Sequence, residues 1–302
     1  MFRIRIQNKK KCIWYCSAVV SFLLFLLLLG WTNHLANTQD AQQMAGRWSE
    51  KKDVAQISCF FSSKAEVTED TIQSFEYSLK NVLQEASITE TSENPSARLW
   101  VDAYSADGKI TLVNGKNTLD ANAIGIGGDF FMFHPLKLIT GAYFSGNDLM
   151  QDYCIIDQDA AWQLFGSNDV VGMTVYIGNV PHIVTGVVQR PDSRMDKAAG
   201  LNSTVVYVSY ETLSAYGTNN GINHYEIVMP NPVDEFAYGK VKEGIGIDEK
   251  NVEIVENSRR YSLPNRIKTI LAFGTRSMNG KAIIYPYWEN LARGYEDIIA
   301  LL

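Results

Sequence analysis

The sequence predicts an α+β fold, in which an N-terminal transmembrane helix precedes an extracytoplasmic domain made of a split βαβ layer and a β-rich insertion. Three observations support this prediction. Ile13–Trp31 is a continuous apolar run without a charged residue, and two strand–helix–strand patterns follow it, one beginning at Val54 and one at Tyr225. Because a long β-rich stretch separates the two patterns, they resemble the halves of one layer interrupted by an insertion.

The apolar run is long enough to cross a membrane. Nineteen helical residues cover roughly 28 Å, about the hydrocarbon thickness of a bilayer. The positive-inside rule predicts a cytoplasmic N-terminus, because no acidic residue precedes Asp40 and five cations precede the run: Arg3, Arg5, Lys9, Lys10 and Lys11. The alternatives are a cleaved signal peptide, which the missing Ala-x-Ala site at Gly30–Ala36 disfavours, and a buried soluble helix, which the unbroken apolar run disfavours.

Composition and charge exclude some functions. The 302 residues are 46% hydrophobic and 20% charged, as in ordinary globular proteins. Without the five N-terminal cations, 22 of the 27 basic residues remain against 33 acidic ones, a net charge of −11. A domain of this charge is not expected to bind nucleic acid or to dock on anionic lipid.

The first strand–helix–strand pattern begins at Val54–Phe61, a strand with apolar residues in alternation. Thr68 is expected to cap the next helix, whose apolar residues recur every three or four positions. A second strand is expected at Arg98–Tyr104. Asp107-Gly108 predicts a hairpin turn, with a return strand at Lys109–Val113.

The second pattern has a strand containing Tyr225, Ile227 and Met229, a helix from about Val233 to Gly244, and a strand at Val252–Val255. Between the patterns we expect further short elements, with a helix capped by Asp157 or Asp159. The predicted insertion elements are strands at Tyr153–Ile156, Val175–Ile177, His182–Val188 and Thr204–Val208, and helices at Asp159–Phe165 and Tyr210–Tyr216.

The C-terminal part is expected to be helical, with one helix opened by Pro264 and another by Pro286. Ile298–Leu302 has the composition of the start of a second membrane segment. The expected division is a cytoplasmic N-terminus at 1–12, a transmembrane helix at 13–31, a stalk at 32–53, an extracytoplasmic core at 54–257 and a C-terminal helical segment at 258–302.

No catalytic, cofactor-binding or metal site is predicted. The four histidines, His34, His134, His182 and His224, form no His-x-His or His-Glu-x-x-His pair, so His134 is expected to support a turn and His182 a hairpin. Gly125–Gly128 is expected to be strand and turn rather than a phosphate loop, since Asp129 would repel phosphate. The spacing of Asp152, Asp157 and Asp159 does not fit a calcium loop, and Asn202–Thr204 is only a possible glycosylation sequon.

The cysteines and aromatic residues are expected to be structural. Cys59 and Cys154 lie in apolar strand-like runs, which favours buried thiols over a disulfide. Cys12 and Cys16 lie at the cytoplasmic end of the membrane run. The 15 Tyr and 13 Phe residues favour packing on strand faces over the lining of a ligand groove.

The string Phe130–Phe144, followed by Asp148, resembles the MacB-like periplasmic core domain of ABC transporter permeases. The order of later motifs fits as well: Ile155-Ile156, Ala160–Gly166, Val171–Val175 and Val184–Val188. The resemblance implies a porter-like subdomain at 54–122 and 223–257, interrupted by a β-rich subdomain at 123–222. It also implies three membrane helices after the domain, a multi-span permease partner or a self-dimer, and a separate or fused ABC-type ATPase.

Two hypotheses follow from the sequence. The first is a non-enzymatic permease component, anchored in the cell membrane, that couples ATP hydrolysis by a partner ATPase to export or mechanotransmission. This chain has no Walker motif, so the ATPase would be another protein. The second is a single-pass surface module that binds a peptide, a lipid or a neighbouring envelope complex through the β-rich insertion. An anchored hydrolase is the weakest alternative, since no catalytic constellation is apparent.

Overall fold

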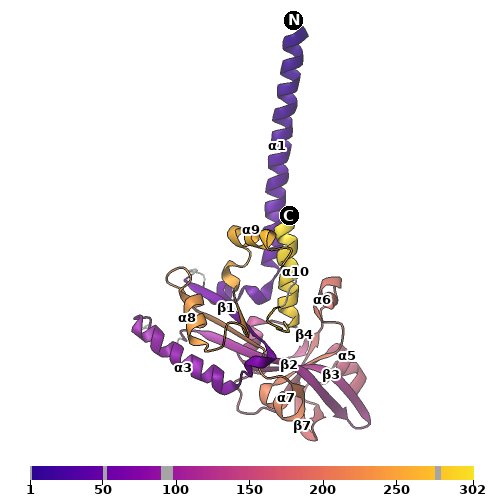
Figure 1. Ribbon diagram of the computed structural model, residues 1–302. Helices are drawn as coiled ribbons and strands as arrows, with labels where there is room; N and C mark the ends of the chain where they lie inside the picture. The colour runs from indigo at the N-terminus through magenta and orange to yellow at the C-terminus, as the bar shows by residue number, and fades with distance from the viewer. Residues whose placement is uncertain (1, 50–52, 90–97, 276–279) are drawn as a thin grey trace.

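The computed structural model describes residues 2–49, 53–89, 98–275 and 280–302, with the backbone alone for residues 2–10. Helix α1 (Phe2–Asn37) stands away from the folded domain, which lies at its C-terminal end (Figure 1). Within α1, Lys11–Asn37 is long and apolar enough to cross a membrane, with a mean hydropathy of 2.5. Its large side chains are exposed, including Trp14 at 77%, so α1 is not a core helix of this domain.

The domain contains a sheet of eleven strands with helices packed against it. The strands are β1 (Val54–Phe61), β2 (Val101–Asn114), β3 (Asn117–Gly128), β4 (Lys137–Gly141), β5 (Tyr153–Asp157), β6 (Thr174–Ile177), β7 (Val180–Gln189), β8 (Val205–Ser209), β9 (Thr218–Asn219), β10 (His224–Pro230) and β11 (Val252–Glu256). The helices after α1 are α2 (Met44–Trp48), α3 (Glu69–Glu85), α4 (Phe130–Phe133), α5 (Gln158–Phe165), α6 (Arg194–Ala199), α7 (Tyr210–Tyr216), α8 (Phe236–Gly244), α9 (Leu263–Leu271) and α10 (Tyr287–Leu301), with short 3-10 turns at Asp40–Gln42, Ser63–Ala65 and Asn257–Arg259.

The predicted split βαβ layer is confirmed. Strands β11, β1, β10 and β2 are neighbours in that order, and each adjacent pair is antiparallel. The units β1–α3–β2 and β10–α8–β11 therefore interleave, as in ferredoxin-like folds. One face of this layer is apolar and packs on α3 and α8, through residues such as Ile57, Tyr225, Phe75 and Val241. Thr68 forms a capping box with Thr71 at the start of α3.

The β-rich part closes on itself. Strand β2 pairs with β3, β3 with β8, β8 with β5, β5 with β7, β7 with β6, and β6 returns to β2. These pairings form a ring of six strands around a core of small and branched apolar side chains, including Leu112, Ile156, Val184 and Val206. Strand β2 belongs to both the layer and the ring, and the predicted boundary at 122/123 falls within β3.

The prediction of a turn at Asp107-Gly108 is wrong. Strand β2 continues through both residues, and the reversal occurs at Gly115-Lys116, where Gly115 has a φ of +60°. An Asp-Gly pair usually forms a turn, because the Asp side chain can bond to the backbone nearby and Gly, which has no Cβ, adopts a positive φ. Here the side chain of Asn223 accepts a hydrogen bond from the backbone N–H of Asp107 and donates one to its carboxylate, so the pair is held in an extended strand.

Gly108 is required for a close approach between strands. A Cβ at this position would lie 2.3 Å from the backbone oxygen of Thr218 in the paired strand β9. We expect Gly108→Ala to lower the free energy of unfolding by about 1–3 kcal/mol, measured by chemical denaturation. Gly239→Ala is the matched control, because Gly239 lies inside α8 with open space around it and alanine should stabilise the helix by about 0.5–1 kcal/mol. Equal effects of the two changes would contradict the close-approach argument.

The other helices and strands that were predicted are present, whereas α4, β4 and α6 were not predicted. Asp157 caps α5 by accepting a hydrogen bond from the backbone N–H of Ala160 at 2.8 Å, and Gly166 ends the helix in the left-handed region. The β6–β7 hairpin turns at Gly178-Asn179, with Pro181 tolerated opposite Tyr176. At the C-terminus, α9 and α10 form where proline was expected to open helices.

Candidate functional site

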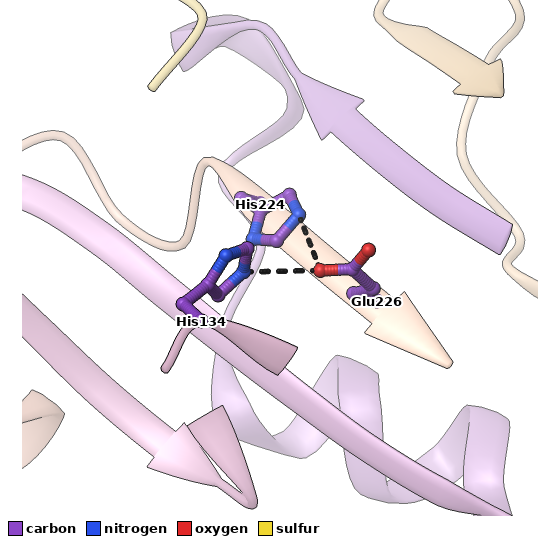
Figure 2. Close-up of side chains that lie close together, drawn as sticks. All are labelled: His134, His224 and Glu226. Carbon is purple, nitrogen blue, oxygen red and sulfur yellow. Dashed lines mark ion pairs between the residues drawn. The ribbon is translucent and has the colours of Figure 1, made fainter. Parts of the chain in front are cut away.

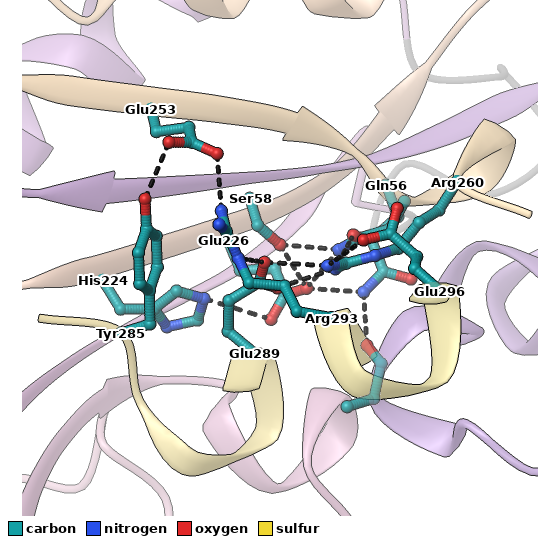
Figure 3. A network of polar contacts seen from close by, with 12 residues as sticks. Gln56, Ser58, His224, Glu226, Glu253, Arg260, Tyr285, Glu289, Arg293 and Glu296 are labelled. Atoms are coloured by element: carbon teal, nitrogen blue, oxygen red, sulfur yellow. Dashed lines mark hydrogen bonds and ion pairs between the residues drawn. The ribbon is translucent and has the colours of Figure 1, made fainter. Parts of the chain in front are cut away.

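The second face of the βαβ layer is polar, although it is buried. Along β1 and β10, the residues that alternate with the apolar ones include Gln56, Ser58, His224 and Glu226, and each is no more than 1% exposed. Such residues would normally face water on a half-covered sheet. Here the connections around α2 and the C-terminal helices cover them (Figures 1 and 3). We call this buried polar face and the helical residues bonded to it the coupling site.

The centre of the coupling site is a buried ion pair between Arg260 and Glu289. The guanidinium of Arg260 donates from Nη1 to Glu289 Oε2 at 2.6 Å and from Nη2 to Glu289 Oε1 at 2.8 Å. Both side chains are at most 2% exposed, and Glu296 adds a second carboxylate at 3.2 Å. Burial alone would lower the pKa of Arg260, but these two carboxylates raise it above its usual value. The two-pronged geometry fixes α10 to the segment that follows β11.

A second arm of the site joins α10 to the edge of the sheet. Arg293 donates from Nε to Glu289 at 2.7 Å and also pairs with Glu253 of β11 at 2.5 Å. Its guanidinium lies 3.8 Å from the ring centre of Tyr285, and the Tyr285 hydroxyl donates to Glu253 at 2.7 Å (Figure 3). Burial alone would raise the pKa of Glu253, but Arg293 and Tyr285 lower it. Glu253 therefore stays ionised and holds α10 against β11.

Asn257 connects the ion pair to the centre of the sheet. Its Oδ1 accepts from Arg260 at 3.3 Å, and its Nδ2 donates to Ser58 Oγ at 2.6 Å and to Glu226 Oε1 at 3.2 Å. Glu226 Oε1 also accepts from Ser58 at 2.8 Å and from Gln56 at 2.5 Å. A continuous set of hydrogen bonds therefore runs from α10 to the middle strands of the layer.

The other oxygen of Glu226 faces two histidines (Figure 2). Glu226 Oε2 lies 3.0 Å from His134 Nε2 and 3.6 Å from His224 Nε2. Burial alone would raise the pKa of Glu226, but His134, His224 and Gln56 lower it, so this carboxyl group is an anion inside the protein. Burial lowers the pKa of His224 to about 3, and His224 is therefore neutral at ordinary pH.

The coupling site also reaches α1. Arg266 of α9 donates to Thr32 Oγ1 at 3.0 Å and to Asn33 Oδ1 at 3.4 Å, near the end of α1. Helix α10 packs beside the same end of α1, and the C-terminus lies there (Figure 1). Helices α9 and α10 therefore meet α1 at the base of the candidate membrane segment, and Arg293 ties α10 to strand β11.

The structure separates most residues that the sequence singled out. His182 lies in the ring and bonds to Thr212 at 3.1 Å, whereas His34 is exposed on α1. Cys59 and Cys154 are free, buried thiols in different core clusters, as predicted. Burial raises the pKa of the Cys154 thiol to about 12. Gly125–Gly128 is part of strand β3, also as predicted.

Sequence analysis missed the meeting of His134, His224 and Glu226. The third member is distant in sequence, because His134 follows α4, far along the chain from β10. One signal was present: His224 and Glu226 are two residues apart on a strand, so their side chains share a face. The general expectation that aromatic residues pack rather than line a groove fits Phe130, Phe131, Phe133 and Phe144, which lie in one core cluster with Trp288, although on α4 and a loop and not on strand faces.

These features define a class of protein. Its domain has a βαβ layer, a strand ring and a buried polar site, and it follows an apolar N-terminal helix. The chain belongs to the family described as MacB-like periplasmic core domain, which it matches over residues 21–254. It is thus a periplasmic-core-type domain of an ABC transporter permease. The family and the apolar helix α1 together indicate a membrane protein with an extracytoplasmic domain.

Several relatives match part of the chain. The macrolide export ATP-binding/permease protein MacB of Chromobacterium violaceum is 32% identical over 99 residues, which cover 32% of this chain and 15% of that protein. The protein of the same description from Pasteurella multocida is 30% identical over 98 residues, covering 32% of this chain and 14% of that protein. The match therefore spans less than one sixth of the length of these relatives.

Two solved structures align with this chain at low identity. The periplasmic region of MacB from Actinobacillus actinomycetemcomitans aligns at 20% identity and a TM-score of 0.44, covering 72% of this chain and 92% of that one. The extracellular domain of the noncanonic ABC-type transporter YknZ from Gram-positive bacteria aligns at 17% identity and a TM-score of 0.42, covering 66% of this chain and 99% of that one.

Proposed function

We propose that this chain is a permease-type component of an ABC transporter, and that its extracytoplasmic domain couples ATP hydrolysis by a partner ATPase to substrate export or mechanotransmission. The family membership supports the class of protein. The observation that carries the coupling role is the buried ion pair of Arg260 with Glu289, because it fixes α10 to the segment that follows β11 and both side chains are shielded from solvent. A displacement of the helices would then move the domain with them.

The orientation belongs to the same proposal. The cations before the membrane run favour a cytoplasmic N-terminus, which places the domain on the other side of the membrane. We further propose the division into a porter-like part at 54–122 and 223–257 and a β-rich part at 123–222. In this arrangement the ATPase moves the helices at the membrane, and the β-rich part transmits that movement away from the membrane.

The proposal is tested by purifying the tagged full-length chain from its native membranes in mild detergent. We expect an ABC-type ATPase and a multi-span permease, or a second copy of the chain with an ATPase, to co-purify in fixed ratio. ATP hydrolysis by the recovered complex should fall in an Arg260→Leu variant and not in Arg259→Leu, whose ion pair with Asp234 is at the surface. Recovery of the chain alone from membranes that contain the ATPase would overturn the proposal.

A surface interaction module is the second candidate, and one observation favours it. Leu149 is fully exposed, and the adjacent Met150 is 56% exposed, in the segment between β4 and β5. Large apolar side chains at such a position suit contact with a protein partner. This candidate would be favoured over transport if cells without the partner ATPase kept full activity of the protein and a Leu149→Ser variant lost that activity.

A further inference from the structure

We propose that His134, His224 and Glu226 form a binding site for a divalent transition-metal ion such as Zn²⁺. The site lies where the end of α4 and strand β10 meet beneath α10. Two imidazoles and one carboxylate are a ligand set that zinc accepts in proteins. The inference is independent of the transport proposal, because it rests only on these side chains and their surroundings.

The geometry places the ligand atoms around one point. The ligand atoms of the three side chains all lie within 4.8 Å of one another. Ligands about 2.0–2.2 Å from a tetrahedral zinc are roughly 3.3–3.5 Å apart. The distances from Glu226 Oε2 to His134 Nε2 and to His224 Nε2, 3.0 and 3.6 Å, lie on either side of that separation. Small side-chain adjustments would therefore admit an ion.

The atoms that face the centre lack ordinary hydrogen bonds. Glu226 Oε2, His134 Nε2 and His224 Nε2 are all buried and make no well-formed hydrogen bond, although Glu226 Oε2 forms an ion pair with His134 Nε2 at 3.0 Å. Buried polar atoms that lack well-formed hydrogen bonds are uncommon, and three that lie so close together call for an explanation. The nearby Arg47 does not supply it, because its guanidinium donates to the carbonyl oxygens of Met132 and Phe133 instead. A bound cation would satisfy the three atoms together.

Outer contacts orient two of the ligands. Glu226 Oε1 is held by Gln56, Ser58 and Asn257, which leaves Oε2 directed at the histidines. His224 Nδ1 lies 3.4 Å from Ser105 Oγ, so a proton on Nδ1 would leave Nε2 with a free lone pair. Such outer contacts are typical of metal sites, where they fix the ligand and its tautomer.

Aromatic rings surround the site, and a pocket lies next to it. The ring of Trp288 lies 4.2 Å from that of His134, and Phe60 stacks on His224 at 5.2 Å. A pocket of about 230 Å³ lies next to the site and is lined by both His134 and Trp288. Because Trp288 belongs to α10, an ion at this site would brace α4, β10 and the face on which α10 packs.

The test uses the full-length chain in detergent with Cys12→Ser and Cys16→Ser, since these two thiols are exposed and could bind zinc themselves. After chelation and dialysis, the metal alone is added, and bound Zn²⁺ is counted by mass spectrometry of the metal. We expect one ion per chain, a rise in Tm with Zn²⁺, and a visible Co²⁺ spectrum typical of tetrahedral nitrogen and oxygen ligands. Glu226→Gln and His224→Gln should each weaken Zn²⁺ binding by at least tenfold.

His182→Gln and His34→Gln are the matched controls, because each removes a histidine outside the cluster. Both should bind Zn²⁺ as the parent chain does. Melting in excess chelator shows whether each variant folds; if Glu226→Gln does not fold, the stoichiometry and Co²⁺ spectrum of the parent chain decide. Absence of stoichiometric Zn²⁺ binding by the parent chain, or equal losses in controls and cluster variants, would overturn the proposal and leave a buried ion pair.

Discussion

Arg260→Leu is expected to lower the free energy of unfolding by about 3–5 kcal/mol, because it leaves the buried carboxylate of Glu289 without its main partner. The loss of stability comes from the buried charge that is left unpaired, and not from the net contribution of the ion pair to stability. The double variant Arg260→Leu with Glu289→Leu should therefore recover much of the loss. Chemical denaturation of the full chain, followed by circular dichroism, measures all three proteins.

Arg259→Leu is the control, since Arg259 pairs at the surface with Asp234, whose side chain is 87% exposed. Its effect should stay below about 1 kcal/mol. If Arg259→Leu and Arg260→Leu lower the free energy of unfolding equally, or if the double variant is no more stable than Arg260→Leu, the buried ion pair does not hold α10.

Trp288→Ala is expected to cost about 3–5 kcal/mol, since the indole is 5% exposed and its removal leaves a cavity among Phe130, His134 and His224. The loss should be largest at α10, which Trp288 anchors to the sheet. Hydrogen exchange resolved by residue should show faster exchange in α10 than in α3, which packs on the opposite face of the layer.

Trp162→Ala provides the comparison for this change. Trp162 lies on α5 and is 58% exposed, so its removal should change the free energy of unfolding by no more than about 0.5 kcal/mol. Uniform acceleration of exchange throughout the domain in Trp288→Ala would show that the indole supports the whole core rather than the attachment of α10.

Much of the fold was predictable because its signals are local. The apolar stripe of α3, the cap at Asp157 and the prolines before the C-terminal helices each act within one or two helical turns. The alternation of Tyr225, Ile227 and Met229 likewise marked β10. The Asp107-Gly108 pair failed as a turn signal because its partner, Asn223, is 116 residues away along the chain.

The coupling site could not be predicted for the same physical reason. Arg260 and Glu289 are separated by 29 residues, and the sequence around each residue resembles that of an exposed helix or loop. His224 and Glu226 lie between the apolar residues of β10, where a polar side chain normally faces water. Only the packing of the C-terminal helices over that face makes these residues buried, and packing between distant segments leaves no local pattern.

Strand β2 joins the two parts of the domain. It is one unbroken run of 14 residues, roughly 45 Å long, that serves the βαβ layer at one end and the strand ring at the other. Bending the two parts against each other would break several ladder hydrogen bonds at once. In the transport mechanism that we propose, the domain would therefore turn as one stiff body about the base of α1. A small tilt of the helices at the membrane would then become a larger sweep at the far end of the ring.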